Sequence, residues 1–254
     1  MRVRFTLIGL AAAATLAAQG PGGRLGGFGG PGGRFGAIDL APHGAPVTGA
    51  PYSALETTQM VRALSGGNQI QRQDQSKVYR DSQGRVRTEH TFTPPPGAAN
   101  QTARTTITIY DPVAGTVTVL DPQNKTAFQR KVNTSNRPTS APRTNTNQNV
   151  QTQDLGTQIV NGVSATGTRT TLTIPAGAVG NTQPIQVVRE VWTSTDLKVP
   201  VLIKITDPRF GDTTTQLTNI VRAEPDPSLF QIPSDYTVKT GPAGRGPRGW
   251  RANH

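Results

Sequence analysis

The chain has 254 residues with 33% hydrophobic content, 28 glycines, 21 prolines and a net charge of +11. This length fits one large or two small domains, and so low an apolar content indicates that part of the chain does not fold. The absence of cysteine excludes disulfides, thiol catalysis and thiolate metal sites.

The first segment, 1–19, has the pattern of a secretory signal peptide. Arg2 and Arg4 precede an apolar run, 5–18, which is too short to span a bilayer and ends in small residues. An uncleaved N-terminal anchor is the alternative. No Cys follows the run for lipid attachment, and the two arginines are not adjacent as in a twin-arginine signal. We therefore expect a periplasmic or secreted protein.

The flanking regions are basic and poor in large apolar side chains. We predict a disordered Gly- and Pro-rich spacer at 20–50, a β domain at 51–238 and a basic disordered tail at 239–254. Contact of Trp250 with a membrane interface is the alternative for the tail. Loss of Arg2 and Arg4 with the signal peptide lowers the net charge from +11 by two, to +9. The glycine-rich stretch resembles RNA-binding RGG segments. An exported chain is instead expected to bind anionic envelope surfaces through its tails, and not nucleic acid.

Alternating apolar and polar side chains predict β-strands along the domain. In 199–206, Val199, Val201, Ile203 and Ile205 fall on one face, as in a strand with one buried side. Segment 52–64 is compatible with a helix, but the Ser-Gly-Gly-Asn turn that follows favours a strand. Further strands are predicted at 69–80, 85–92, 104–110, 116–120, 125–132, 155–160, 163–174 and 213–223 and around Trp192.

The connections carry strong turn signals. Asp111, Asp121 and Asp207 each begin an Asp-Pro turn, where the backbone uses the carboxylate locally, so they do not indicate metal or acid–base chemistry. Asn161-Gly162 predicts a hairpin. The polar segment 133–153 is predicted to be a mobile loop, either a lid or a linker.

After the last long strand, Pro225 and Pro227 stop the ladder. Asp226 or Ser228 can cap one helical turn there, and this turn places Leu229 and Phe230 at one end of the core. The residues thus predict one curved, mostly antiparallel sheet with little helix.

No catalytic motif accompanies this pattern. The sequence has no G-x-S-x-G, no H-E-x-x-H and no phosphate loop. Of the three histidines, His43 and His254 lie in the ends predicted to be disordered, and His90 shares its face of the predicted strand with no second His and no carboxylate. We predict no enzyme activity, no catalytic residue, no metal site and no cofactor. A hydrolase that uses carboxylates alone stays open, and its residues would be Glu190, Asp196 and Glu224.

Two sequence resemblances bear on function. The segments YRDSQGRVR (79–87), ITIYDPVAGTVTVLDPQNKTA (107–127) and 156–181 resemble a group of uncharacterised exported proteins common in acidobacteria, which implies no known activity. The segments REVWTSTDLKVPVLIK (189–204) and DPSLFQIPSDYTV (226–238) are similar to the ends of periplasmic lipoprotein carriers and sigma-factor-regulator sensor domains. This second resemblance implies an unclosed β-barrel whose concave face holds acyl chains or a partner, although the helices of those carriers are longer than this chain offers.

We therefore expect a non-enzymatic envelope module that binds a lipid or an envelope protein in the concave apolar face of its sheet. A structural or surface-adhesion protein, bound electrostatically to the envelope, is the alternative. The candidate ligand-binding side chains on the apolar face are Ile107, Ile109, Val117, Val119, Trp192, Val201 and Ile203.

Overall fold

The structure is a computed structural model that describes residues 46–92, 102–132 and 149–241. The predicted signal peptide, the spacer up to residue 45, loop residues 133–148 and the tail beyond residue 241 lie outside these ranges.

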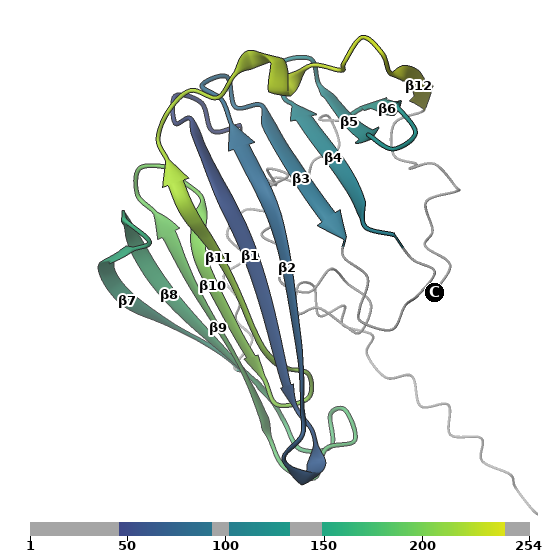
Figure 1. Cartoon of the computed structure of the whole chain (residues 1–254). Coiled ribbons are helices and arrows are strands. Elements are labelled where there is room, and N and C mark those ends of the chain that lie inside the picture. The colour runs from purple at the N-terminus through teal and green to yellow at the C-terminus, as the bar shows by residue number, and fades with distance from the viewer. Residues whose placement is uncertain (1–45, 93–101, 133–148, 242–254) are drawn as a thin grey trace, which may run out of the picture. The chain divides into compact units, whose positions relative to one another are not determined.

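The described residues form one 12-stranded sheet (Figure 1). Its strand order is β12-β6-β5-β4-β3-β2-β1-β11-β10-β9-β8-β7, so β12 and β7 are its two edges and the sheet is not closed. This arrangement confirms the predicted curved, unclosed and mainly β fold. The strands are β1 (Tyr52–Ala63), β2 (Gln69–Arg80), β3 (Val86–Phe92), β4 (Arg104–Asp111), β5 (Thr116–Asp121), β6 (Thr126–Lys131), β7 (Val150–Val160), β8 (Val163–Ile174), β9 (Ile185–Ser194), β10 (Pro200–Asp207), β11 (Gly211–Val221) and β12 (Thr237–Gly241).

The ambiguous segment 52–64 is a strand, β1, and it lies in the middle of the sheet. It pairs along its whole length with β2 and over most of its length with β11. At its start, Tyr52, Ala54 and Glu56 are buried and the residues between them are half-buried. This period of two confirms the strand and excludes the helical alternative.

One strand pair departs from the predicted antiparallel arrangement. β12 runs parallel to β6, with Thr237 opposite Thr126 and Gly241 opposite Arg130. The extended end of the chain therefore does not continue the meander beside β11. Residues 222–236 instead lead the chain from β11, in the middle of the sheet, to β12 at its edge.

Three predicted boundaries are wrong by a few residues. β7 begins at Val150, inside the segment predicted as a loop, and β12 continues to Gly241, inside the predicted tail. The spacer was predicted to reach residue 50, but the Gly49 amide donates to the Ser82 carbonyl oxygen at 2.9 Å. In each case backbone pairing with a distant segment orders residues whose composition alone indicates a loop.

The turns agree with their predicted chemistry. Asn161 and Gly162 both have positive φ, 49° and 83°, as a two-residue type I′ hairpin requires. The Asp111 carboxylate accepts from the Val113 and Ala114 amides, both at 2.9 Å. Asp121 and Asp207 likewise accept backbone amides two residues ahead, which confirms their local role.

The helical content of the described residues is two 3₁₀ turns, η1 (Ser65–Gly67) and η2 (Pro227–Phe230). Asp226 caps η2, since its carboxylate accepts from the Ser228 amide at 2.8 Å. In the described part of the chain, neither is long and apolar enough to cross a membrane.

Phe230 of η2 is buried in a cluster with Ile107, Ile109, Leu120 and Ala127. The Arg85 guanidinium lies 4.9 Å from the centre of the Phe230 ring. The turn therefore covers one face of β4–β6. This agrees with the prediction that it places Leu229 and Phe230 at one end of the core.

Candidate functional site

The two faces of the sheet can be followed through its register, because directly paired residues project to the same side. Tyr52 pairs with Arg80, Arg80 with Val86, and Val86 with Tyr110. We call the face that carries these four side chains the inner face. The opposite, outer face carries the cluster around Phe230.

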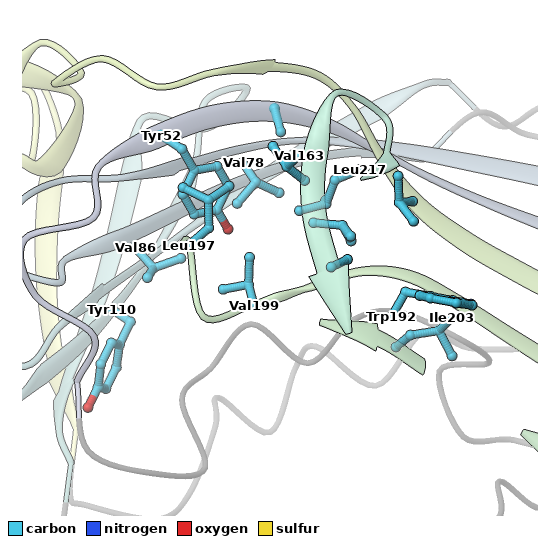
Figure 2. Close-up of a cluster of buried hydrophobic side chains, with 14 residues drawn as sticks. Tyr52, Val78, Val86, Tyr110, Val163, Trp192, Leu197, Val199, Ile203 and Leu217 are labelled. Carbon is cyan, nitrogen blue, oxygen red and sulfur yellow. The ribbon is translucent and has the colours of Figure 1, made fainter. Parts of the chain in front are cut away.

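The inner face carries the larger buried cluster, which draws side chains from strands on both sides of β1 (Figure 2). We call it the inner cluster. Because residues of β3 and β4 share it with residues of β7–β10, strands far apart in the sheet order meet over this face. Its buried members are Tyr52, Ala54, Val78, Val86, Tyr110, Val160, Val163, Ala165, Trp192, Leu197, Val199, Val201, Ile203 and Leu217.

The seven predicted ligand-binding residues do not share one face. Trp192, Val201 and Ile203 belong to the inner cluster, and Val117 packs against it half-buried. Val119 has the same parity as Val117 on β5 and is also half-buried.

By contrast, Ile107 and Ile109 are buried against Phe230 on the outer face. The alternation within each strand was predicted correctly, but the relative face of β4 and β5 depends on their register. Ile107 pairs with Leu120 and not with Val119. The structure thus brings four of the seven residues to the inner face, Val117, Val119, Val201 and Ile203, and a fifth, Trp192, joins the inner cluster from the opposite parity of β9.

Trp192 sits where the register changes. The pairing of β9 with β10 shifts between Pro200 and Leu202, so an extra residue of β10 lies opposite Trp192. Such a bulge raises the local twist of the strands. The neighbouring Val191 also packs against the inner cluster, so the cluster takes side chains of both parities from β9 at this point.

The other side of Trp192 faces a glycine. Trp192 pairs with Gly167 on β8, and a Cβ added to Gly167 would lie only 2.7 Å from two carbons of the indole ring. The ring therefore lies directly over the Gly167 backbone.

Charged groups are buried on the inner face. The Arg80 guanidinium donates to the Ala50 carbonyl oxygen at 2.7 and 3.0 Å and to the Leu197 carbonyl oxygen at 2.6 Å. It lies 4.8 Å from the centre of the Tyr52 ring. Burial lowers the pKa of Arg80, and burial also raises the pKa of Tyr52 to about 12, an effect that the Arg80 charge partly offsets.

A polar row crosses the inner face next to the inner cluster. Glu56, Ser76 and His90 are direct partners on β1, β2 and β3. Glu56 is only 6% exposed, and the Ser76 Oγ and His90 Nδ1 atoms are 3.1 Å apart. His90 thus bonds to a hydroxyl, as a packed histidine would. Hydroxyl, imidazole and carboxylate groups in one row can hydrogen-bond to the polar end of a ligand.

Each of the three carboxylates considered for hydrolysis forms an ion pair or a hydrogen bond with another residue of the chain. Glu190 forms an ion pair with Arg169 at 2.6 Å, and Asp196 one with Arg222 at 3.0 Å. Glu224 accepts from the Ser82 amide at 3.1 Å. Within the ranges that the structure describes, no group of three or more acidic or histidine residues could hold a metal ion.

Sequence reasoning missed Glu56 and Arg80 as inner-face residues. Glu56 continues the alternation of Tyr52 and Ala54, so its side was readable once segment 52–64 was taken as a strand. Arg80 ends a strand next to a turn, where an arginine is usually solvated. Its burial depends on the carbonyl of Leu197, which lies 117 residues away in the sequence.

No family model and no curated protein matches the chain. Among solved structures, an uncharacterised conserved protein from Thermus thermophilus aligns at a TM-score of 0.40 and 12% identity, over 76% of this chain and 91% of that one. MucB in complex with MucA(peri) aligns at 0.41 and 11% identity, over 76% of this chain and 57% of that one. A LolA superfamily protein from Nitrosomonas europaea aligns at 0.32 and 10% identity, over 76% and 95%.

These matches include both kinds of protein that the C-terminal resemblance indicated, a LolA-superfamily protein and an RseB-like protein. The chain spans a little over half of the MucB chain. Identities and TM-scores of this size transfer no ligand or partner. The resemblance to exported acidobacterial proteins stays a prediction.

Proposed function

We propose that the chain is a non-enzymatic binding module of the bacterial envelope that holds an acyl lipid or a segment of a partner protein on the inner face of its sheet. One observation carries the proposal: the inner face combines a large apolar cluster with a polar row of Glu56, Ser76 and His90, in which the carboxylate of Glu56 is buried. Burying a charged group is costly, so a face that served only as a core would be more stable with apolar side chains there. A ligand with an apolar and a polar part needs both.

The location follows from the N-terminal sequence. The pattern of 1–19 supports export, and the net charge of +11 supports contact with anionic envelope surfaces. Five candidate residues, Val117, Val119, Val201 and Ile203 on the inner face and Trp192 in the inner cluster, are proposed to line the ligand's apolar part.

Uptake of a fluorescent fatty acid by the delipidated full-length chain tests the lipid form of the proposal. We expect saturable uptake that persists in 1 M salt, because an apolar contact on a sheet face is not screened. If delipidated protein takes up no fatty acid, and protein purified from its own envelope carries neither lipid nor partner in native mass spectrometry, the proposal fails.

A structural or adhesion protein is the second candidate, and the net charge of +11 favours it. Its attachment would be electrostatic, and at 1 M salt the screening length falls to about 3 Å. Binding to anionic vesicles that disappears at 1 M salt, with no fatty-acid uptake at either salt concentration, would favour this second candidate.

A further inference from the structure

Arg189 projects from β9 to the inner face, away from the residues already described. It pairs with Ile205 on β10 and with Thr170 on β8. The same row continues through Thr213 to Met60, which has the parity of Tyr52 on β1. The guanidinium of Arg189 therefore belongs to the inner face, and the side chain is half-buried.

Several other buried or half-buried arginines in the described ranges have partners. Arg85 binds Asp81, Arg87 binds Glu89, and Arg209 binds Asp207. No hydrogen bond, ion pair or ring contact of the Arg189 side chain with any residue in the described ranges is found. Burial lowers the pKa of Arg189, and no carboxylate acts against this effect.

The chain itself offers little to neutralise this charge. The next residue, Glu190, projects to the opposite face and binds Arg169. Asp207 on the neighbouring strand is bound by Arg209. Of the chain's 15 acidic residues, only Asp39 lies outside the described ranges. An anion from outside the chain would complement the site.

The surroundings of Arg189 indicate what kind of anion fits. Val187 and Val191 flank it on β9, and Val187 is only 1% exposed. Its cross-strand neighbour Ile205 packs against the inner cluster. Thr170 and Thr213 add hydroxyl groups in the same row. A guanidinium forms its strongest hydrogen bonds with carboxylate and phosphate oxygens, and the apolar neighbours favour an anion that is attached to a hydrocarbon chain.

We propose that Arg189 binds the anionic head group of an acyl lipid whose hydrocarbon chain lies along the inner face. This inference rests on the proposed function and adds to it the charge of the ligand and the residue that selects it. The lipid is thus an amphiphile with a carboxylate or phosphate head, and neutral lipids of the same chain length bind more weakly.

Displacement of the neutral fluorophore N-phenyl-1-naphthylamine from the full-length chain tests this inference. The competitors are laurate, dodecanol and inorganic phosphate, and the variants are Arg189→Gln and Arg189→Lys. Arg72→Gln is the matched control, since Arg72 lies in the same row on β2, is exposed, and its loss lowers the net charge equally.

We expect laurate to bind the native chain at least about 10-fold more tightly than dodecanol, the gain of a charge-assisted hydrogen bond. Arg189→Gln should remove this preference and leave dodecanol unchanged. Arg189→Lys should keep part of it, and Arg72→Gln should keep all of it. If Arg189→Gln does not fold, the comparison of laurate with dodecanol on the native chain and on Arg189→Lys tests the inference.

Equal binding of laurate and dodecanol to the native chain would overturn the role of Arg189 and leave the proposed function standing. Competition by inorganic phosphate as strong as that by laurate would show a simple anion site, which also overturns the inference. Failure of both laurate and dodecanol to displace the fluorophore would contradict the lipid-binding function itself.

Discussion

The contact between Trp192 and Gly167 predicts that Gly167→Ala destabilises the protein, and that the same substitution no longer does so once the indole ring is removed. In Gly167→Ala, the new methyl carbon would lie 2.7 Å from ring carbons Cη2 and Cζ3 and 2.8 Å from Cε3. Carbon atoms pack at about 3.5–4.0 Å, so the indole must move by about 1 Å within a cluster where it is only 8% exposed. Overpacking of this kind costs about 1–3 kcal/mol.

Without the ring, the same substitution should stabilise the protein. The φ of Gly167 lies outside the left-handed region, so Ala is compatible with its backbone and restricts the unfolded chain, a gain of about 0.4–1 kcal/mol. In a Trp192→Leu background, Gly167→Ala should therefore be neutral or stabilising. Urea unfolding followed by far-UV circular dichroism measures all four proteins. An equal cost of Gly167→Ala in both backgrounds would refute the stacking of Trp192 on Gly167.

Three further predictions concern buried groups. Arg80→Met should lower the free energy of unfolding by about 2–4 kcal/mol, because two carbonyls lose charge-assisted hydrogen bonds. The exposed control Arg72→Met should change it by less than about 0.5 kcal/mol. Equal effects of the two substitutions in urea unfolding would contradict the role of Arg80. The pKa of Tyr52 is about 12 in the folded chain against 10.0 unfolded. The folded state therefore keeps a proton that the unfolded state loses, and stability should fall as pH rises from about 10 to about 12. Ultraviolet titration should show a tyrosine that ionises near pH 12 and is missing in Tyr52→Phe; if that signal remains in Tyr52→Phe, it belongs to another tyrosine. Phe230→Ala should lower the free energy of unfolding by about 3–5 kcal/mol. A decrease below about 1 kcal/mol in urea unfolding would mean that η2 does not cover the outer face.

Local sequence signals were sufficient for the strands and turns. Period-two alternation in 199–206, the Asn161-Gly162 pair and the Asp-Pro turns depend on neighbouring residues alone, and the structure agrees with each of them. The cap at Asp226 was readable for the same reason.

Features that depend on pairing between distant strands could not be predicted from the sequence. Ile107 and Val119 alternate equally well within their own strands, but only the register of β4 with β5 puts them on opposite faces. The parallel pairing of β12 with β6 joins segments more than 100 positions apart, and the five residues of β12, of which Val238 is the only large apolar one, carry no signal for it. Burial of Arg189 likewise depends on its neighbours on β8 and β10, which its own segment does not specify.

Quenching of Trp192 fluorescence by a brominated fatty acid tests the central claim most directly. The variant Trp250→Phe leaves Trp192 as the only tryptophan of the chain. We expect 9,10-dibromostearate to quench its emission saturably, and unbrominated stearate to displace the quencher, because Trp192 belongs to the inner cluster over which the hydrocarbon chain would lie. Bound dibromostearate that leaves the emission of Trp192 unchanged would contradict binding on the inner face.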